Sequence, residues 1–169
     1  SLPMPCKLIL IKKIYLELLM TAIIPQLTQI QALTVTGISV RTKNEEEFNP
    51  QKAQLPHLWK QFYGSTTNET QQNSPIYGVY HHYESDSSGH YTVTAGIEIP
   101  NESKATHLDR VIIKAGDYLV FEAAVTNPSA IIKAWQTIWN YFNETSTYQR
   151  SYLTDFEIYR TPLESAVYI

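Results

Sequence analysis

The sequence of 169 residues contains a single cysteine, Cys6, which excludes an internal disulfide framework and any zinc site built from cysteines. Runs of lysine or arginine are absent, and the formal net charge is -3. Because phosphate binding needs a clustered basic surface, direct binding of nucleic acid is not expected. The sequence also lacks a helix-turn-helix, a phosphate loop, a nucleotide fingerprint and a nucleophile elbow. We therefore expect neither a cofactor nor a metal.

Long hydrophobic runs are missing as well, since the chain has no uninterrupted span of the about 20 apolar residues that cross a bilayer. Residues 7–20 are mostly apolar, but Lys12, Lys13 and Glu17 interrupt them. The segment has neither the unbroken apolar core nor the cleavage site of a signal peptide. We therefore expect a cytoplasmic protein without a membrane span.

Residues 1–31 are predicted to form a mainly helical N-terminal extension. Apolar side chains would surround most of a helix over residues 7–20, so an isolated solvated helix is not expected. The extension should pack on a partner subunit, which would give a homodimer, or cover an apolar patch of its own domain.

Two segments, over residues 32–98 and 107–169, contain the same order of elements. In each, a strand is followed by an amphipathic helix and a two-stranded hairpin. Both helices carry the pattern apolar-Trp-x-x-Phe, which matches Trp59 with Trp139. The predicted fold class is α+β, with two pseudo-symmetric strand–helix–strand–strand repeats that form an antiparallel sheet and enclose a ligand groove.

The last hairpin raises the main functional question, because its first strand is expected to be paired and half buried and yet carries carboxylates. In the stretch YLTDFEIYR, alternation places Phe156 on one face and Asp155, Glu157 and Tyr159 on the other. Glu157 is either a solvent-facing charge on a half-exposed strand or a carboxylate at the floor of the groove. In the second case desolvation, together with the like charge of Asp155, would raise its pKa and make it a strong partner for a cation.

Aromatic residues are plentiful, with 12 tyrosines, five phenylalanines and three tryptophans, and aromatic faces attract cations. The candidates for the walls of the groove are Trp59, Tyr80, Tyr83, Phe121 and Trp139. Each of them alone fits core packing better than a ligand cage. Together with Glu157 they point to an organic cation.

The pair His81 and His82, followed by Glu84, resembles a metal cluster. Adjacent residues of a strand, however, point to opposite faces. A site that uses His82 and Glu84 is geometrically possible, but surface decoration is the preferred interpretation.

Four ordered segments, PIYGVYHHYESDSSGHYTVTAGIEI, VIIKAGDYLVFEA, AWQTIWNYF and YLTDFEIYR, resemble the GyrI-like small-molecule-binding family. This is the effector-binding domain that is also attached to AraC-type and MerR-type transcription activators. The resemblance covers residues 32–169 and is strongest to stand-alone, integron-cassette-like members. It implies two repeats around a groove for amphipathic, often cationic compounds. It also implies that the glutamate in the strand matching DFEIY, here Glu157, is the central anchor.

The first functional hypothesis is therefore a stand-alone binding module for amphipathic cations that senses or sequesters drugs, xenobiotics or effectors. With no DNA-binding segment in view, it would act in transcription regulation only through a partner. The alternative is an enzyme, because some GyrI-like proteins hydrolyse reactive cyclopropane-bearing compounds, and Glu157 would then be the general base. A third hypothesis is a protein-binding role of the gyrase-inhibitor type. Binding without catalysis is the preferred prediction, although binder and hydrolase need the same carboxylate.

Overall fold

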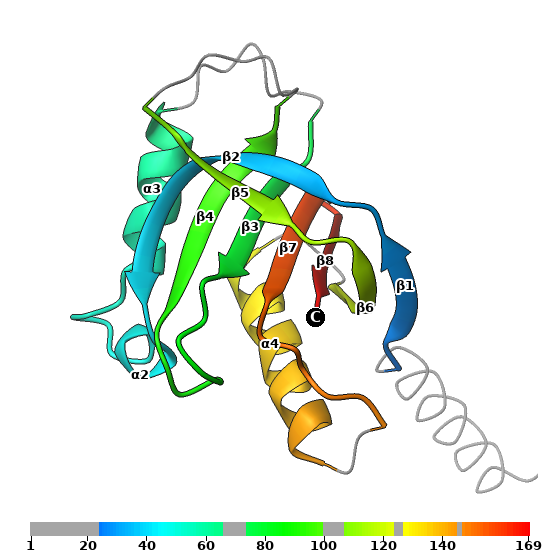
Figure 1. Ribbon diagram of the computed structural model, residues 1–169. Coiled ribbons are helices and arrows are strands. Elements are labelled where there is room, and N and C mark those ends of the chain that lie inside the picture. The colour runs from blue at the N-terminus through cyan, green and yellow to red at the C-terminus, as the bar shows by residue number, and fades with distance from the viewer. Residues whose placement is uncertain (1–23, 66–73, 100–106, 124–126, 145–146) are drawn as a thin grey trace, which may run out of the picture.

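The computed structural model describes residues 24–65, 74–99, 107–123, 127–144 and 147–169, which form one curled sheet of eight strands with three helices (Figure 1). The first half contains β1 (Gln26–Ile30), β2 (Leu33–Thr42), α2 (Asn44–Glu47), α3 (Leu55–Ser65), β3 (Ile76–His81) and β4 (Tyr91–Glu98). The second half contains β5 (Asp109–Ile113), β6 (Gly116–Ala123), α4 (Pro128–Asn143), β7 (Thr154–Thr161) and β8 (Glu164–Tyr168). No helix in these ranges is long and apolar enough to cross a membrane.

The strand order is β1-β6-β8-β7-β3-β4-β2-β5, and all neighbouring strands are antiparallel. From the centre outward, β3-β4-β2-β5 on one side corresponds to β7-β8-β6-β1 on the other. Strand β1 of the first half thus lies at the far edge of the second half, and strand β5 of the second half lies at the far edge of the first. This order confirms the α+β class and the two pseudo-symmetric repeats.

Strand β1 differs from the sequence-based prediction. Residues 1–31 were expected to form a mainly helical extension, but Gln26–Ile30 pairs with β6 as an edge strand. The stretch QLTQI is short and largely polar, so nothing in it announces a strand. What remains of the predicted extension, residues 1–23, lies outside the described residues.

Strand β2 is long and curved in Figure 1. Its backbone closely approaches that of β4, with which it pairs. Gly37 and Gly96 lie directly opposite each other in these strands. A Cβ atom on Gly37 would lie 1.9 Å from the carbonyl oxygen of Ala95. Only glycine therefore permits the two strands to approach at this point.

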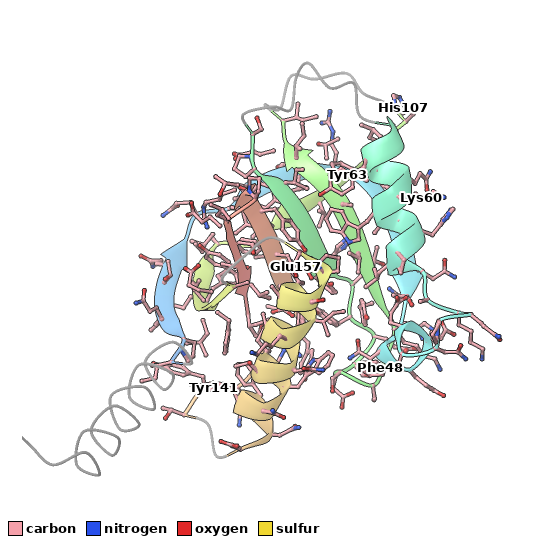
Figure 2. The ribbon with its side chains drawn as sticks, turned by 180° about the vertical axis from the view of Figure 1, so that it is seen from behind. Phe48, Lys60, Tyr63, His107, Tyr141 and Glu157 are labelled. Atoms are coloured by element: carbon pink, nitrogen blue, oxygen red, sulfur yellow. The ribbon has the colours of Figure 1, made fainter. Side chains whose placement is uncertain are left out.

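Helices α3 and α4 pack against the same face of the sheet, and Figure 2 shows both in front of it with Glu157 between them. Their buried side chains Leu58, Phe62, Trp135 and Ile138 share one core with inward residues of β3, β4, β6 and β8. The other face of the sheet encloses a second apolar core, which includes Phe156 of β7. With both faces occupied, a carboxylate on the inner strands is buried whichever way it points.

Candidate ligand-binding site

A groove of about 600 Å³ lies between α3 and α4, with β3 and β7 as its floor. This volume falls within the range of roughly 300–1,000 Å³ that is typical of sites for drug-sized ligands. Its lining is mainly aromatic and aliphatic, and the aromatic members are Phe48, Trp59, Tyr63, Tyr80, Tyr83, Tyr91, Trp135, Trp139 and Tyr159. The predicted groove between the repeats is therefore present.

Glu157 is the charged group at the floor of this groove, and its side chain is almost wholly buried, with 2% of the residue exposed. Its Oε1 accepts hydrogen bonds from the Tyr80 hydroxyl and from the Trp135 Nε1–H, each at 2.8 Å. Its Oε2 accepts a hydrogen bond from the Tyr159 hydroxyl at 2.6 Å. Three donors thus fix both oxygens in place.

Gly78 makes room for this carboxylate. It pairs with Glu157 across β3 and β7, on the central strands of the sheet. A Cβ atom on Gly78 would lie 2.9 Å from Glu157 Oε2 and 3.0 Å from the ring of Trp59. The absence of a side chain on one strand lets the glutamate of the other occupy the centre of the groove.

Glu157 is a buried carboxyl group that has no counterion among the described residues. Burial raises the pKa of its carboxyl group, while the hydrogen bonds from Tyr159, Trp135 and Tyr80 oppose this rise. None of the ion pairs formed among the described residues includes Glu157. The interpretation of Glu157 as a solvent-facing charge is therefore wrong, because its side chain is buried at the floor of the groove.

Asp155 is also buried, at 1% exposed, but it has a counterion. Arg150 Nη2 donates to Asp155 Oδ2 at 2.8 Å, and the Tyr83 hydroxyl donates to the same oxygen at 2.5 Å. Burial raises the pKa of Asp155, and Arg150 and Tyr83 oppose the rise. Both pKa values are thus raised as predicted, but burial is the cause and the other carboxylate is not. Asp155 is also shielded from solvent, because the Arg150 side chain that pairs with it is itself buried.

Four of the five aromatic candidates line the groove, namely Trp59, Tyr80, Tyr83 and Trp139. Phe121 does not, and its inclusion was wrong. It lies in β6, away from the central strands, and packs against Tyr141 and Phe142 in the helix–sheet core. An alternating strand pattern predicts that Phe121 points toward the helices. It does not predict whether helix side chains cover the ring or leave it open to the groove.

Trp135 donates directly to Glu157, but it was not among the residues predicted for the site. It lies one helical turn before Trp139 on α4, so the spacing of the two tryptophans is the signal that could have identified it. The contacts also correct the predicted match of Trp59 with Trp139. Trp59 packs on Tyr159, and Trp135 packs on Tyr80. The two tyrosines are equivalent, because Tyr80 follows Gly78 by two residues, Tyr159 follows Glu157 by two, and Gly78 pairs with Glu157. Trp59 therefore corresponds to Trp135.

His81 and His82 do not point to opposite faces as predicted. Strand β3 ends at His81, and His82 has a left-handed backbone with φ of 48°, which turns the two rings toward each other. Their Nδ1 atoms lie 2.6 Å apart, and Thr94 binds His81 Nε2 at 2.8 Å. Burial lowers the pKa of His81 to about 4. Glu84 binds His90 instead of His82, and the described residues contain no cluster of three potential metal ligands.

A two-repeat antiparallel sheet with an apolar groove between two helices, and with a buried carboxylate at the floor of that groove, is typical of a domain that binds small molecules. Residues 26–169 match the family described as integron-associated effector binding protein, and the chain belongs to this family. The family boundary at residue 26 agrees with the position of β1. The resemblance seen in the sequence is thereby confirmed.

Known relatives agree with this assignment. An integron cassette protein from the mobile metagenome of Vibrio cholerae has a similar structure, with a TM-score of 0.78 and 31% identity over 86% of this chain and 94% of that one. YobU of Bacillus subtilis (strain 168), which is named as a transcriptional regulator protein, is 24% identical over 79% of this chain and 84% of its own. The structure of SAV2435 bound to tetraphenylphosphonium shares the fold, with a TM-score of 0.64 and 18% identity over 85% and 91% of the two chains.

Proposed function

We propose that the groove binds an amphipathic organic cation and that Glu157 is its counterion. The observation that carries this proposal is a buried carboxylate that has three hydrogen-bond donors but, among the described residues, no cationic partner. Burying an unpaired charge is costly, and a ligand cation would offset that cost. The aromatic walls supply apolar contact and cation–π attraction.

Two features of the relatives support the proposal. SAV2435, which shares the fold, has been solved with tetraphenylphosphonium, a large hydrophobic cation. YobU is named as a transcriptional regulator protein, which suits a role in sensing. We infer that this chain senses or sequesters a cationic drug-like or effector compound, and that any effect on transcription passes through a partner.

Calorimetric titration with tetraphenylphosphonium tests the proposal, with neutral triphenylphosphine oxide as the comparison ligand. Glu157→Gln removes the charge and keeps the shape: its amide oxygen can accept from Tyr80 and Trp135, and its NH2 group can donate to the rotatable Tyr159 hydroxyl. We expect the cation to lose roughly 2–4 kcal/mol of binding free energy, as for a buried charged contact. The neutral ligand should lose much less.

Glu122→Gln is the matched control, because Glu122 is an exposed glutamate of β6 outside the groove. It should leave both affinities unchanged. Equal affinity of wild type and Glu157→Gln for tetraphenylphosphonium would contradict the proposal.

A hydrolase remains the second candidate, and the raised pKa of Glu157 is the observation that favours it. A carboxyl group whose pKa moves toward the working pH becomes a better general base for the activation of water. Product analysis after incubation with an electrophilic cyclopropane decides the point. Turnover by wild type that is lost in Glu157→Gln would establish the enzyme, and unchanged substrate would leave the binding function alone.

A further inference from the structure

The groove contains two similar pairs of tilted, neighbouring rings, one pair on each helix. On α3 the rings of Trp59 and Tyr63 lie 6.0 Å apart at an interplanar angle of 32°. On α4 the rings of Trp135 and Trp139 lie 6.3 Å apart at 35°. In both pairs the second residue follows the first by one helical turn, so the two walls present the same arrangement.

The first residue of each pair, Trp59 or Trp135, also contacts a tyrosine that belongs to the other repeat. Trp59 packs on Tyr159 of β7 with a centroid separation of 5.5 Å, and Trp135 packs on Tyr80 of β3 at 4.9 Å. Both tyrosines donate to Glu157, at 2.6 Å and 2.8 Å respectively. One carboxylate therefore serves two aromatic half-sites, which we call the α3 half-site (Trp59, Tyr63, Tyr159) and the α4 half-site (Trp135, Trp139, Tyr80).

The charged residues that line the groove differ in their partners and in their burial. Glu47 accepts hydrogen bonds from the Thr42 hydroxyl and from the backbone N–H groups of Gln54 and Leu55, so it is occupied in holding the start of α3. Arg150 is paired with Asp155. Glu157 likewise accepts only from neutral donors and has no counterion among the described residues. It differs from Glu47, which is half-buried, because it is almost wholly buried at the floor of the groove and contacts both half-sites.

We propose that the preferred ligand is a monocation with its charge at the centre and an aromatic arm on each side. This inference rests on the proposed function of the groove and adds the shape and charge of its ligand. The cation would lie on Glu157, and one arm would enter each half-site. A cation with its charge at one end would fill only one half-site. A dication would place its second charge in a half-site, and none of the residues that define the two half-sites is a carboxylate.

A matched series of ligands tests this shape: tetramethylammonium, benzyltrimethylammonium and dibenzyldimethylammonium carry the same single charge and no, one or two arms. We expect affinity to rise by about tenfold with each arm, because a buried aromatic contact contributes on the order of 1 kcal/mol or more. The second arm should contribute about as much as the first. A second arm that adds less than about twofold would overturn the inference.

The outer rings Tyr63 and Trp139 are the residues to replace, since both are at least partly exposed and neither is one of the three donors that hold Glu157. Each of the single variants Tyr63→Leu and Trp139→Leu should weaken dibenzyldimethylammonium by about tenfold. The one-armed ligand can choose the intact half-site, so each single variant should weaken it by only about twofold. The double variant should weaken the one-armed ligand by about tenfold. Tyr148→Leu, outside the groove, is the control.

The outcomes separate this inference from the proposed function. If one single variant abolishes binding of the one-armed ligand and the other has no effect, the groove has one working end and the two-armed ligand is wrong. If arms make no difference but Glu157→Gln weakens every cation, the proposed function stands and this inference fails. If Glu157→Gln leaves all three ligands unaffected, the proposed function itself fails. Thermal unfolding of each variant shows whether it is folded.

Discussion

At the scale of the residue, the burial of the Glu157 carboxyl group lowers the stability of the folded protein when that group is ionised. Its pKa is raised in the folded protein, so between its ordinary value and the raised value the folded state holds more protons than the unfolded state. Stability therefore falls as pH rises through this window, and above the raised pKa the full cost of the buried charge is present. Under the proposed function, a bound cation would offset this cost.

We predict that Glu157→Gln, which should weaken cation binding, is more stable than wild type at neutral pH. The advantage should shrink as the pH falls through the raised pKa toward the ordinary value, because the wild-type carboxyl group is then protonated. Chemical denaturation without ligand at a series of pH values measures the difference. Glu122→Gln should show no such trend, and a Glu157→Gln variant that is less stable at pH 7 would contradict the assignment of cost.

The two tyrosines on Glu157 should tune the pH dependence of binding. Their hydrogen bonds favour the ionised carboxylate, so Tyr80→Phe or Tyr159→Phe should raise the pKa of Glu157 further. The pH below which cation affinity is lost should shift upward in both variants. Titration with tetraphenylphosphonium across pH measures this midpoint. Tyr83→Phe is the control, since its hydroxyl binds Asp155, and an equal shift there would refute a local effect.

The sequence predicted the position of Glu157 but not its surroundings. Alternation along β7 correctly places Asp155, Glu157 and Tyr159 on one face, because period two is a property of any strand. It does not reveal that Arg150, five residues away, turns back to neutralise Asp155. The orientation of His82 also depends on a left-handed backbone angle, which the residue type does not announce.

At the scale of the element, the central pair of strands depends on a residue without a side chain. We predict that Gly78→Ala destabilises the fold by about 1–3 kcal/mol, since the new methyl group would lie 2.9 Å from Glu157 Oε2 and 3.0 Å from Trp59. It should also weaken cation binding by moving the carboxylate. Denaturation and titration of the same variant measure both effects.

Gly64 provides the control for this substitution. It lies near the end of α3, and a Cβ atom there would have no neighbour within 4 Å. Gly64→Ala should therefore stabilise the protein slightly, by up to about 1 kcal/mol, and leave binding unchanged. Similar losses in the two variants would show that the space at Gly78 has no special role.

Elements with a strong period were predictable, and elements that depend on tertiary contacts were not. The two long helices and both hairpins follow from apolar spacing and turn residues. The short helix α2 forms where Glu47 reaches forward to the N–H groups that begin α3, a contact between residues seven and eight apart in the chain. Strand β1 forms because the edge of β6 is available to it, which its own five residues do not show.

At the scale of the whole molecule, the duplication was visible in the sequence but its registration was not. The shared Trp-x-x-Phe pattern matched Trp59 with Trp139, a shift of one helical turn from the match that the contacts give. An amphipathic helix repeats its buried face every turn, so the pattern alone cannot distinguish registers one turn apart. The paired strands settle the choice, because Gly78 and Glu157 lie directly opposite each other.

The edge of the domain around β1 carries apolar side chains that are exposed to solvent. Ile24, Leu27 and Leu153 are 68%, 53% and 52% exposed, and the latter two border a hollow of about 380 Å³ beside β1 and β6. This patch lies where the N-terminal segment joins the domain, and that segment is itself rich in apolar residues. We predict that deletion of residues 1–19 lowers thermal stability if the segment covers its own domain, and changes the oligomeric state if it packs on a partner subunit. Light scattering and thermal unfolding distinguish these outcomes, and a truncated protein with unchanged mass and unchanged unfolding temperature would refute both.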